Sequence, residues 1–74
     1  MASVSTPRFE KDRLVTARTL LGLTQEELAA AADCSVFSIG KIERGERVPR
    51  GPLLRKIADA LGQPVSYFFT EAAA

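Results

Sequence analysis

The sequence predicts an all-α fold, a single compact domain of five short helices. Apolar residues recur three and four positions apart, which is the helical period, and no stretch alternates apolar and polar residues as a strand does. Glycine, proline and capping residues divide the chain into short segments. With 74 residues, 46% of them hydrophobic and 26% charged, the chain has the size and composition of one globular unit.

The first helix is expected over residues 9–21. Leu14, Ala17 and Leu21 are expected on one apolar stripe, with Leu20 beside it. Gly22 can take the left-handed conformation that ends a helix. The chain upstream is rich in Ser, Thr and Pro, so we expect residues 1–8 to form a flexible N-terminal arm.

The second and third helices are expected over residues 24–32 and 36–44. Thr24 and Glu27 predict a capping box, in which the Thr24 hydroxyl accepts from the Glu27 amide and the Glu27 side chain reaches back. Ser35 is the expected N-cap of the third helix, and a glycine follows that helix. Because the turn between these helices is short, the pair has the spacing of a helix-turn-helix motif.

The fourth helix is expected over residues 53–61, after a proline suited to a first helical turn and before a glycine. Pro64 is expected to begin a fifth helix of a turn or two. Residues 9–70 thereby form the expected domain, with the helix-turn-helix motif at residues 24–44. Residues 71–74 offer nothing to anchor them, and we expect this tail to fray.

Basic side chains gather in one segment of the chain. Residues 41–56 carry a net charge of +4, whereas the rest of the chain carries −3. Clustered positive charge favours a polyanionic partner, although a solvated charged surface gives the same pattern. The bases of this segment are Lys41, Arg44, Arg47, Arg50, Arg55 and Lys56.

Composition argues against several classes of function. The chain has no histidine and one cysteine, Cys34, which excludes histidine-based acid–base catalysis, an internal disulfide and a four-ligand zinc site. We therefore expect no enzyme activity, no metal and no cofactor, and Cys34 is expected to pack in or near the core. No apolar run is long enough to cross a bilayer, so we expect a cytoplasmic protein with no membrane partner.

Three stretches of the sequence carry a resemblance to a known family. They are LTQEELA at residues 23–29, SxxSIxKIERG at 35–45 and LxxIAxALG at 54–62. These stretches resemble the phage repressor and Cro type of helix-turn-helix domain, often described as XRE-like. The resemblance implies a lambda-repressor-like DNA-binding domain whose third helix, residues 36–43, enters the major groove, commonly as a dimer on a two-fold symmetric operator. The function it implies is that of a sequence-specific transcriptional regulator that binds double-stranded DNA.

The resemblance also assigns DNA contacts to individual residues. Family members read bases from the outer face of the third helix, which here carries Val36, Phe37 and Lys41. A lysine suits a guanine edge or a phosphate, and an apolar side chain can pack on a thymine methyl. Contacts to the DNA backbone are implied for Thr24, Gln25, Ser38, Arg44, Arg47 and Arg50.

Val36 and Phe37 depart from the family's pattern, because polar or basic residues are common at these positions. An exposed Val-Phe pair also suits the groove of a protein partner. The sequence therefore leaves an alternative to DNA binding, a protein-interaction module on the same scaffold with these two residues as anchors. Binding that weakens steeply with salt indicates DNA, whereas binding that depends on Phe37 but little on salt indicates a protein.

Two further assignments concern structure and assembly. By resemblance, Arg18 and Glu43 form a structural salt bridge that locks the first helix to the end of the third. Of three successive aromatic residues near the C-terminus, we expect the middle one, Phe68, to enter the core. Tyr67 and Phe69 are then placed to meet a second copy of the chain in a homodimer.

Overall fold

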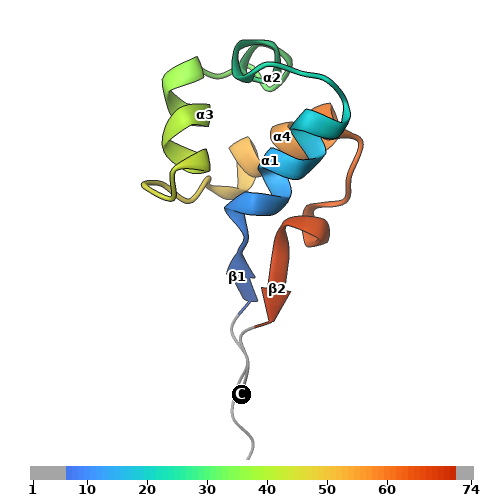
Figure 1. The fold of residues 1–74 in the computed structure, drawn as a ribbon. Coiled ribbons are helices and arrows are strands. Elements are labelled where there is room, and N and C mark those ends of the chain that lie inside the picture. Colours follow the sequence, from blue (N-terminus) through green and yellow to red (C-terminus); the bar gives the residue numbers. More distant parts are fainter. Residues whose placement is uncertain (1–6, 72–74) are drawn as a thin grey trace, which may run out of the picture.

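The computed structural model of the protein describes residues 7–71, which fold into four α-helices, one short 3-10 helix and a two-stranded sheet (Figure 1). The helices surround one core, and the sheet extends away from it. Within residues 7–71 no helix has the length and apolar character needed to cross a membrane. In chain order the elements are β1 (Pro7–Phe9), α1 (Lys11–Leu20), α2 (Gln25–Ala31), α3 (Val36–Glu43), α4 (Gly51–Leu61), η1 (Val65–Phe68) and β2 (Phe69–Glu71).

The C-terminal segment differs from the expectation of five helices. After Pro64 the chain forms the 3-10 helix η1, in which the Tyr67 N–H donates to the Pro64 carbonyl at 3.0 Å. Phe69 then enters β2, so too few residues remain between the proline and the strand to build an α-helix with its i→i−4 bonds. The prediction of a fifth helix is therefore wrong, and the described residues contain four α-helices.

The small sheet is the element that sequence pattern did not predict. β1 and β2 run antiparallel, and the register pairs Pro7 with Glu71, Arg8 with Thr70 and Phe9 with Phe69. Strands of three residues are too short to show an alternating pattern. Their pairing also joins the two ends of the sequence, so no local signal indicates it.

The sheet moves the expected boundaries of the domain. The expected arm, residues 1–8, enters β1 at Pro7, and the first residue of the expected tail, residues 71–74, belongs to β2. For the same reason α1 begins at Lys11, later than expected. The rest of the arm and of the tail lies outside the described residues, and their flexibility stays a prediction.

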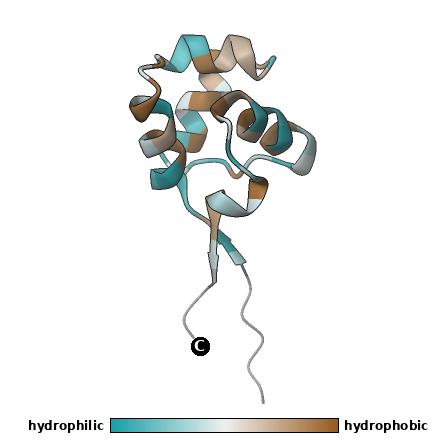
Figure 2. Cartoon of the chain, turned by 90° about the vertical axis from the view of Figure 1, so that its right-hand side faces the viewer, coloured by the Kyte–Doolittle hydropathy of each residue, from teal (hydrophilic) through white to brown (hydrophobic). Residues whose placement is uncertain are grey.

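Buried apolar side chains from every helix form the core, and Figure 2 shows the hydrophobic parts of the helices facing one another. Full burial of a side chain such as Leu28 or Ile57 stabilises the fold by about 1.5–3 kcal/mol. Phe68 is fully buried, which confirms its predicted place. The prediction for Leu21 and Leu20 is wrong, because they lie at the end of α1, beyond the core, and are 55% and 80% exposed. The core consists of Leu14, Ala17, Leu28, Ala29, Ala32, Ile39, Ile42, Leu54, Ile57, Ala58, Leu61 and Phe68.

Local capping determines where α2 and α3 begin. The Glu27 N–H donates to Thr24 Oγ1 at 3.0 Å and the Thr24 N–H donates to Glu27 Oε1 at 2.8 Å, which confirms the predicted capping box. At the start of α3, Ser35 Oγ accepts from the Ser38 N–H at 3.1 Å.

Between the two helices the chain turns at Asp33, whose φ of 56° is left-handed. Aspartate tolerates this conformation better than most residues with a side chain do.

Candidate nucleic-acid interface

α3 has one buried face and one exposed face. Ile39 and Ile42 are fully buried in the core, whereas Phe37 is 77% exposed and Lys41 is also exposed. Because residues four apart lie on the same side of a helix, Phe37 and Lys41 form a ridge that projects into solvent. The helix therefore lies at the surface, with an outer face open to a partner.

Val36 is placed differently from its neighbour Phe37. Its side chain is half-buried and packs against the core, so the two adjacent residues do not form one fully exposed apolar patch. Phe37 is the exposed apolar residue of α3, and Val36 lies at the edge of the outer face.

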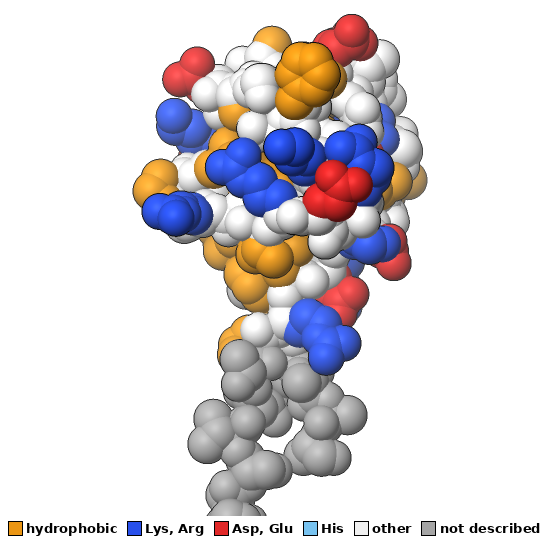
Figure 3. Space-filling view, turned by 90° about the vertical axis from the view of Figure 1, so that its left-hand side faces the viewer, with side chains coloured by type: hydrophobic (Ala, Val, Ile, Leu, Met, Phe, Trp, Pro, Cys, Tyr) orange, Lys and Arg blue, Asp and Glu red, His pale blue; other side chains and the backbone are white. Residues whose placement is uncertain are grey.

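The loop after α3 adds positive charge beside this outer face. Figure 3 shows Lys and Arg side chains crossing the face that α3 presents, with an acidic side chain among them. Four exposed bases belong to α3 and this loop, and they are termed the basic band: Lys41, Arg44, Arg47 and Arg50. Arg50 is the N-cap residue of α4, and its side chain makes no capping hydrogen bond. Positive charge is thus concentrated next to the exposed side of α3.

One hydrogen bond joins Arg47 to α3. Arg47 Nη1 donates to Ser38 Oγ at 3.1 Å, and the Ser35 hydroxyl donates to the same oxygen at 3.1 Å. The hydroxyl of Ser38, a half-buried residue, therefore links the loop to the helix, because it accepts both bonds. Among residues 7–71, no carboxylate forms an ion pair with Arg47, so its charge has only a neutral partner.

Arg44 pairs with an acid on the same loop. Arg44 Nε lies 2.9 Å from Glu46 Oε2, and Arg44 Nη2 lies 3.3 Å from Glu46 Oε1. The Arg44 side chain is 59% exposed and that of Glu46 is 54% exposed. Hydrogen bonds and opposite charge lower the pKa of the Glu46 carboxyl and raise the pKa of Arg44. A Cβ at Gly40 would lie 3.1 Å from Arg44 Nη1, so the glycine leaves room for the guanidinium to lie on α3.

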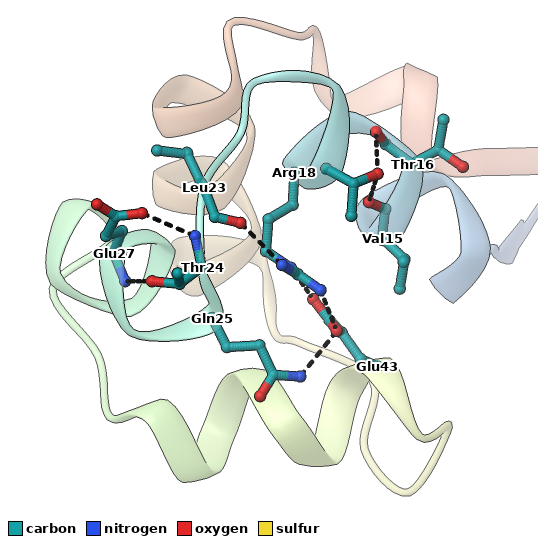
Figure 4. A network of polar contacts seen from close by, with 9 residues as sticks. Val15, Thr16, Arg18, Leu23, Thr24, Gln25, Glu27 and Glu43 are labelled. Carbon is teal, nitrogen blue, oxygen red and sulfur yellow. Dashed lines mark hydrogen bonds and ion pairs between the residues drawn. The ribbon is translucent and has the colours of Figure 1, made fainter.

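A second Arg–Glu pair lies between α1 and α3, as Figure 4 shows, and it is nearly buried. Arg18 Nε lies 2.6 Å from Glu43 Oε2, and Arg18 Nη2 lies 3.0 Å from Glu43 Oε1. The two side chains are only 14% and 8% exposed. Arg18 Nη1 also donates to the Leu23 carbonyl at 2.8 Å. The ion pair expected between Arg18 and Glu43 is therefore present, and it joins α1 to the end of α3.

Gln25, which is half-buried, completes this network, a role that sequence reasoning missed. Its Nε2 donates to Glu43 Oε1 at 2.8 Å, as Figure 4 also shows. The neighbouring Thr24 is exposed, and its hydroxyl accepts from the helix in the capping box. Both residues thus have structural partners within the chain, and their contacts with a DNA backbone stay predictions.

Cys34 lies in the turn between α2 and α3 and packs partly against the core. Burial raises the pKa of its thiol, and the nearby positive charge of Arg47 opposes this only in part. Since the thiolate is the reactive form, a raised pKa makes the sulfur less reactive near neutral pH. This environment supports the packing role expected for Cys34.

The aromatic residues expected at a dimer contact are half-buried within their own chain. Tyr67 meets Phe68 edge-on with ring centres 5.1 Å apart, and the Arg13 guanidinium lies 5.6 Å from the centre of the Tyr67 ring. Phe69 meets Phe9 edge-on across the sheet, with ring centres 5.9 Å apart. Both residues stay partly exposed, and the dimer contact stays a prediction.

Comparison with known proteins connects this arrangement to one family, since residues 14–68 match the helix-turn-helix family HTH_3. The chain is 43% identical over 49 residues to the uncharacterized HTH-type transcriptional regulator YazB of Bacillus subtilis, covering 66% of this chain and 71% of YazB. It is 35% identical over 60 residues to an uncharacterized HTH-type transcriptional regulator of Sinorhizobium medicae, covering 81% of this chain and 43% of that protein. The chain thus spans less than half the length of the second relative.

Solved structures share the fold. The restriction-modification controller protein C.AhdI from Aeromonas hydrophila has a TM-score of 0.77 at 34% identity, over 80% of this chain and 89% of that protein. The P22 c2 repressor, solved in complex with a synthetic operator, has a TM-score of 0.78 at 26% identity, over 82% of this chain and 92% of that protein. The similarity covers most of the described residues.

Proposed function

We propose that this chain, which belongs to the XRE-like helix-turn-helix family HTH_3 of DNA-binding transcriptional regulators, binds operator sites in double-stranded DNA by placing α3 in the major groove. The family is regulatory rather than enzymatic. The observation that carries the proposal is the exposed outer face of α3, from which Phe37 and Lys41 project beside the basic band. The P22 c2 repressor, whose fold is similar, was solved with a synthetic operator.

The two exposed residues of α3 suit different base edges. The Lys41 ammonium can donate to O6 and N7 of guanine, and the Phe37 ring can pack on a thymine methyl. Val36, at the edge of the outer face, offers a smaller apolar contact. Loss of one such contact relaxes the sequence preference at one position, with about 1–3 kcal/mol of discrimination at stake.

The basic band and the start of α2 contact the DNA backbone. Each lysine or arginine that neutralises a phosphate releases counterions, so the affinity falls steeply as the salt concentration rises. Polar side chains beside the band add contacts that orient the protein on the duplex. The proposed backbone contacts are Thr24, Gln25, Ser38, Arg44, Arg47 and Arg50.

The protein acts as a homodimer in this proposal, and two copies meet through Tyr67 and Phe69. These two residues are half-buried, and the area that they leave exposed is available to a second copy. A two-fold dimer presents two copies of α3 and so reads an inverted repeat. Sedimentation at micromolar concentration should give the mass of a dimer, and Phe69→Glu should lower it. A monomer mass at every concentration would contradict the dimer.

Selection of bound sites from random duplexes at two salt concentrations tests the proposal. The expected result is a two-fold symmetric motif that binds more weakly at the higher salt. Arg47→Ala should weaken binding about tenfold at low salt and reduce the salt slope by about one. The control Arg55→Ala removes the same charge on α4, where Asp59 pairs with it at 3.5 Å, and should change the affinity far less. Failure to enrich any duplex at low salt would contradict DNA binding.

The exposure of Phe37 supports one alternative function, a protein-interaction module on the same scaffold. An exposed aromatic residue on a helix can fill an apolar pocket of a partner, with Val36 as a second, partial anchor. In that case Phe37→Ala abolishes partner binding, salt has little effect, and Arg47→Ala is tolerated. The DNA function predicts the opposite order of sensitivity, with Arg47→Ala reducing affinity for every sequence.

A further inference from the structure

We infer that Glu46 competes with DNA phosphate for Arg44 and so holds the affinity for every DNA sequence below the level that the basic band alone would give. This inference rests on the proposed DNA binding and identifies a residue that tunes it. The carboxylate of Glu46 occupies two donors of the Arg44 guanidinium, and an arginine binds phosphate through the same kind of paired donors.

Glu46 is the exposed acid in the most basic segment of the chain. Residues 41–56 are all described, and they contain two acids, Glu43 and Glu46. Glu43 is buried against Arg18 and Gln25, so its charge is compensated inside the fold. The Glu46 carboxylate is more than half exposed and belongs to the loop that carries the basic band. It is therefore the negative charge that an approaching phosphate meets in this segment.

Hydrogen bonds hold the Glu46 carboxylate close to α3. The Glu46 N–H donates to the Lys41 carbonyl at 2.9 Å, which ties the Glu46 backbone to the end of the helix. The Arg44 guanidinium, which the carboxylate contacts, lies over Gly40 on the surface of α3. Arginine and acid are thus kept together on the side of the helix that the proposal places against DNA.

A phosphate that binds Arg44 must replace the carboxylate or share the guanidinium with it. An exposed ion pair is weak, so the carboxylate can be displaced. Its negative charge nevertheless stays on the tethered Glu46 beside the phosphate, and like charges at short range repel each other. Arg47 differs, because its partner is the neutral hydroxyl of Ser38. Arg47 is therefore expected to contribute more to the affinity than Arg44.

Glu46→Gln tests the inference, because the amide keeps the size of the side chain and removes its charge. The affinity for a mixed-sequence duplex at low salt should rise about threefold to tenfold. The plot of log affinity against log salt should become steeper by about one, since one more phosphate is fully neutralised. The selected sequence motif should stay the same, because phosphates are present in every duplex.

Asp59→Asn is the matched control. It also removes an exposed acid that pairs with an arginine, Arg55 on α4, at 3.5 Å. The affinity of this variant should stay within about twofold of the wild type, with an unchanged salt slope. If Glu46→Gln behaves like Asp59→Asn, the inference is overturned.

A double-mutant cycle separates competition at Arg44 from a general effect of charge. Arg44→Ala should weaken binding more in the Glu46→Gln background than in the wild type, because only there does the guanidinium lack a competing acid. Equal losses of affinity in both backgrounds would overturn the inference. Weaker DNA binding by Glu46→Gln would also overturn it, because Glu46 would then help to orient Arg44. If wild type and variant bind no duplex at low salt, the proposed DNA binding fails as well. If both bind equally and with the usual salt dependence, the competition alone is refuted.

Discussion

Two Arg–Glu pairs lie near the end of α3, and they differ in burial. The side chains of Arg18 and Glu43 are nearly buried and join α1 to α3, whereas those of Arg44 and Glu46 are more than half exposed and lie on one loop. Removing one partner of a buried pair leaves a charge without compensation, while water replaces either partner of an exposed pair. The same two residue types thus stabilise the fold in one place and stay available to a ligand in the other.

Glu43→Ala is expected to have the largest effect. It leaves Arg18 with the Leu23 carbonyl alone and removes the acceptor of Gln25. The free energy of unfolding should fall by about 3 kcal/mol, the low end for a buried pair because some exposure remains. For a domain of this size, Tm should fall by more than about 10 °C in thermal unfolding followed by circular dichroism. The matched variant Glu43→Gln keeps an acceptor oxygen and should lose less, and a Tm equal to that of the wild type would remove the contrast between the pairs.

Gln25→Ala should have the next largest effect, because it removes the third member of the network that Arg18 and Glu43 form. The lost hydrogen bond to Glu43 should lower the free energy of unfolding by about 1 kcal/mol, which corresponds to about 4–8 °C in Tm. Chemical denaturation of the protein without DNA measures this loss. If the variant is as stable as the wild type but binds DNA more weakly, Gln25 acts on the DNA backbone and its bond to Glu43 contributes nothing.

Asp33→Gly should raise the stability slightly. It removes the exposed ion pair between Asp33 and Lys56, so it tests how little such a pair contributes to stability. Asp33 has a left-handed φ of 56° that glycine adopts without strain, and its ion pair with Lys56 at 3.5 Å is exposed. The gain in the free energy of unfolding should be about 0.5 kcal/mol, seen as a small rise in Tm. Lys56→Ala, which removes only the ion pair, should leave Tm unchanged. A lower Tm for Asp33→Gly would mean that the exposed pair outweighs the backbone strain.

Glu46→Gln should change the stability least, with a Tm within about 2 °C of the wild type at neutral pH. Hydrogen bonds from Arg44, together with its charge, lower the pKa of the Glu46 carboxyl in the folded protein. A carboxyl with a lowered pKa stabilises the fold above its ordinary pKa, and that stabilisation is lost as the pH falls through the lowered value. Any difference in Tm between the two proteins should therefore vanish in acid. A large loss of stability at neutral pH would contradict this prediction. It would show that the Arg44–Glu46 pair stabilises the fold as the Arg18–Glu43 pair does.

The helix-turn-helix part of the fold could be predicted because its signals are local. The caps at Thr24 and Ser35 act within one turn of the helix that they start, and the helical period alone places Phe37 and Lys41 on the exposed side. The strand that Phe9 ends could not be predicted, because it is three residues long and pairs with the opposite end of the chain.

The partners of the polar side chains were harder to predict than the elements that carry them. Gln25 and Glu43 are 18 residues apart and meet only because α2 packs on α3. Arg44 and Glu46 are close in sequence, but side chains two apart diverge in a regular helix. They meet because Gly45 between them has a φ of 80° and reverses the chain after α3. The residue types and their spacing alone do not predict that this turn brings the Arg44 and Glu46 side chains together.

The pairing of β1 with β2 decides how the molecule responds to a mechanical load. A pull applied at Pro7 and Glu71 acts across the strand ladder, because these residues form its outermost rung. The interstrand hydrogen bonds then open one after another rather than together. Phe9 and Phe69, with ring centres 5.9 Å apart, separate last. A molecule stretched from these two points is therefore expected to open first at the Pro7–Glu71 rung and then toward Phe9 and Phe69.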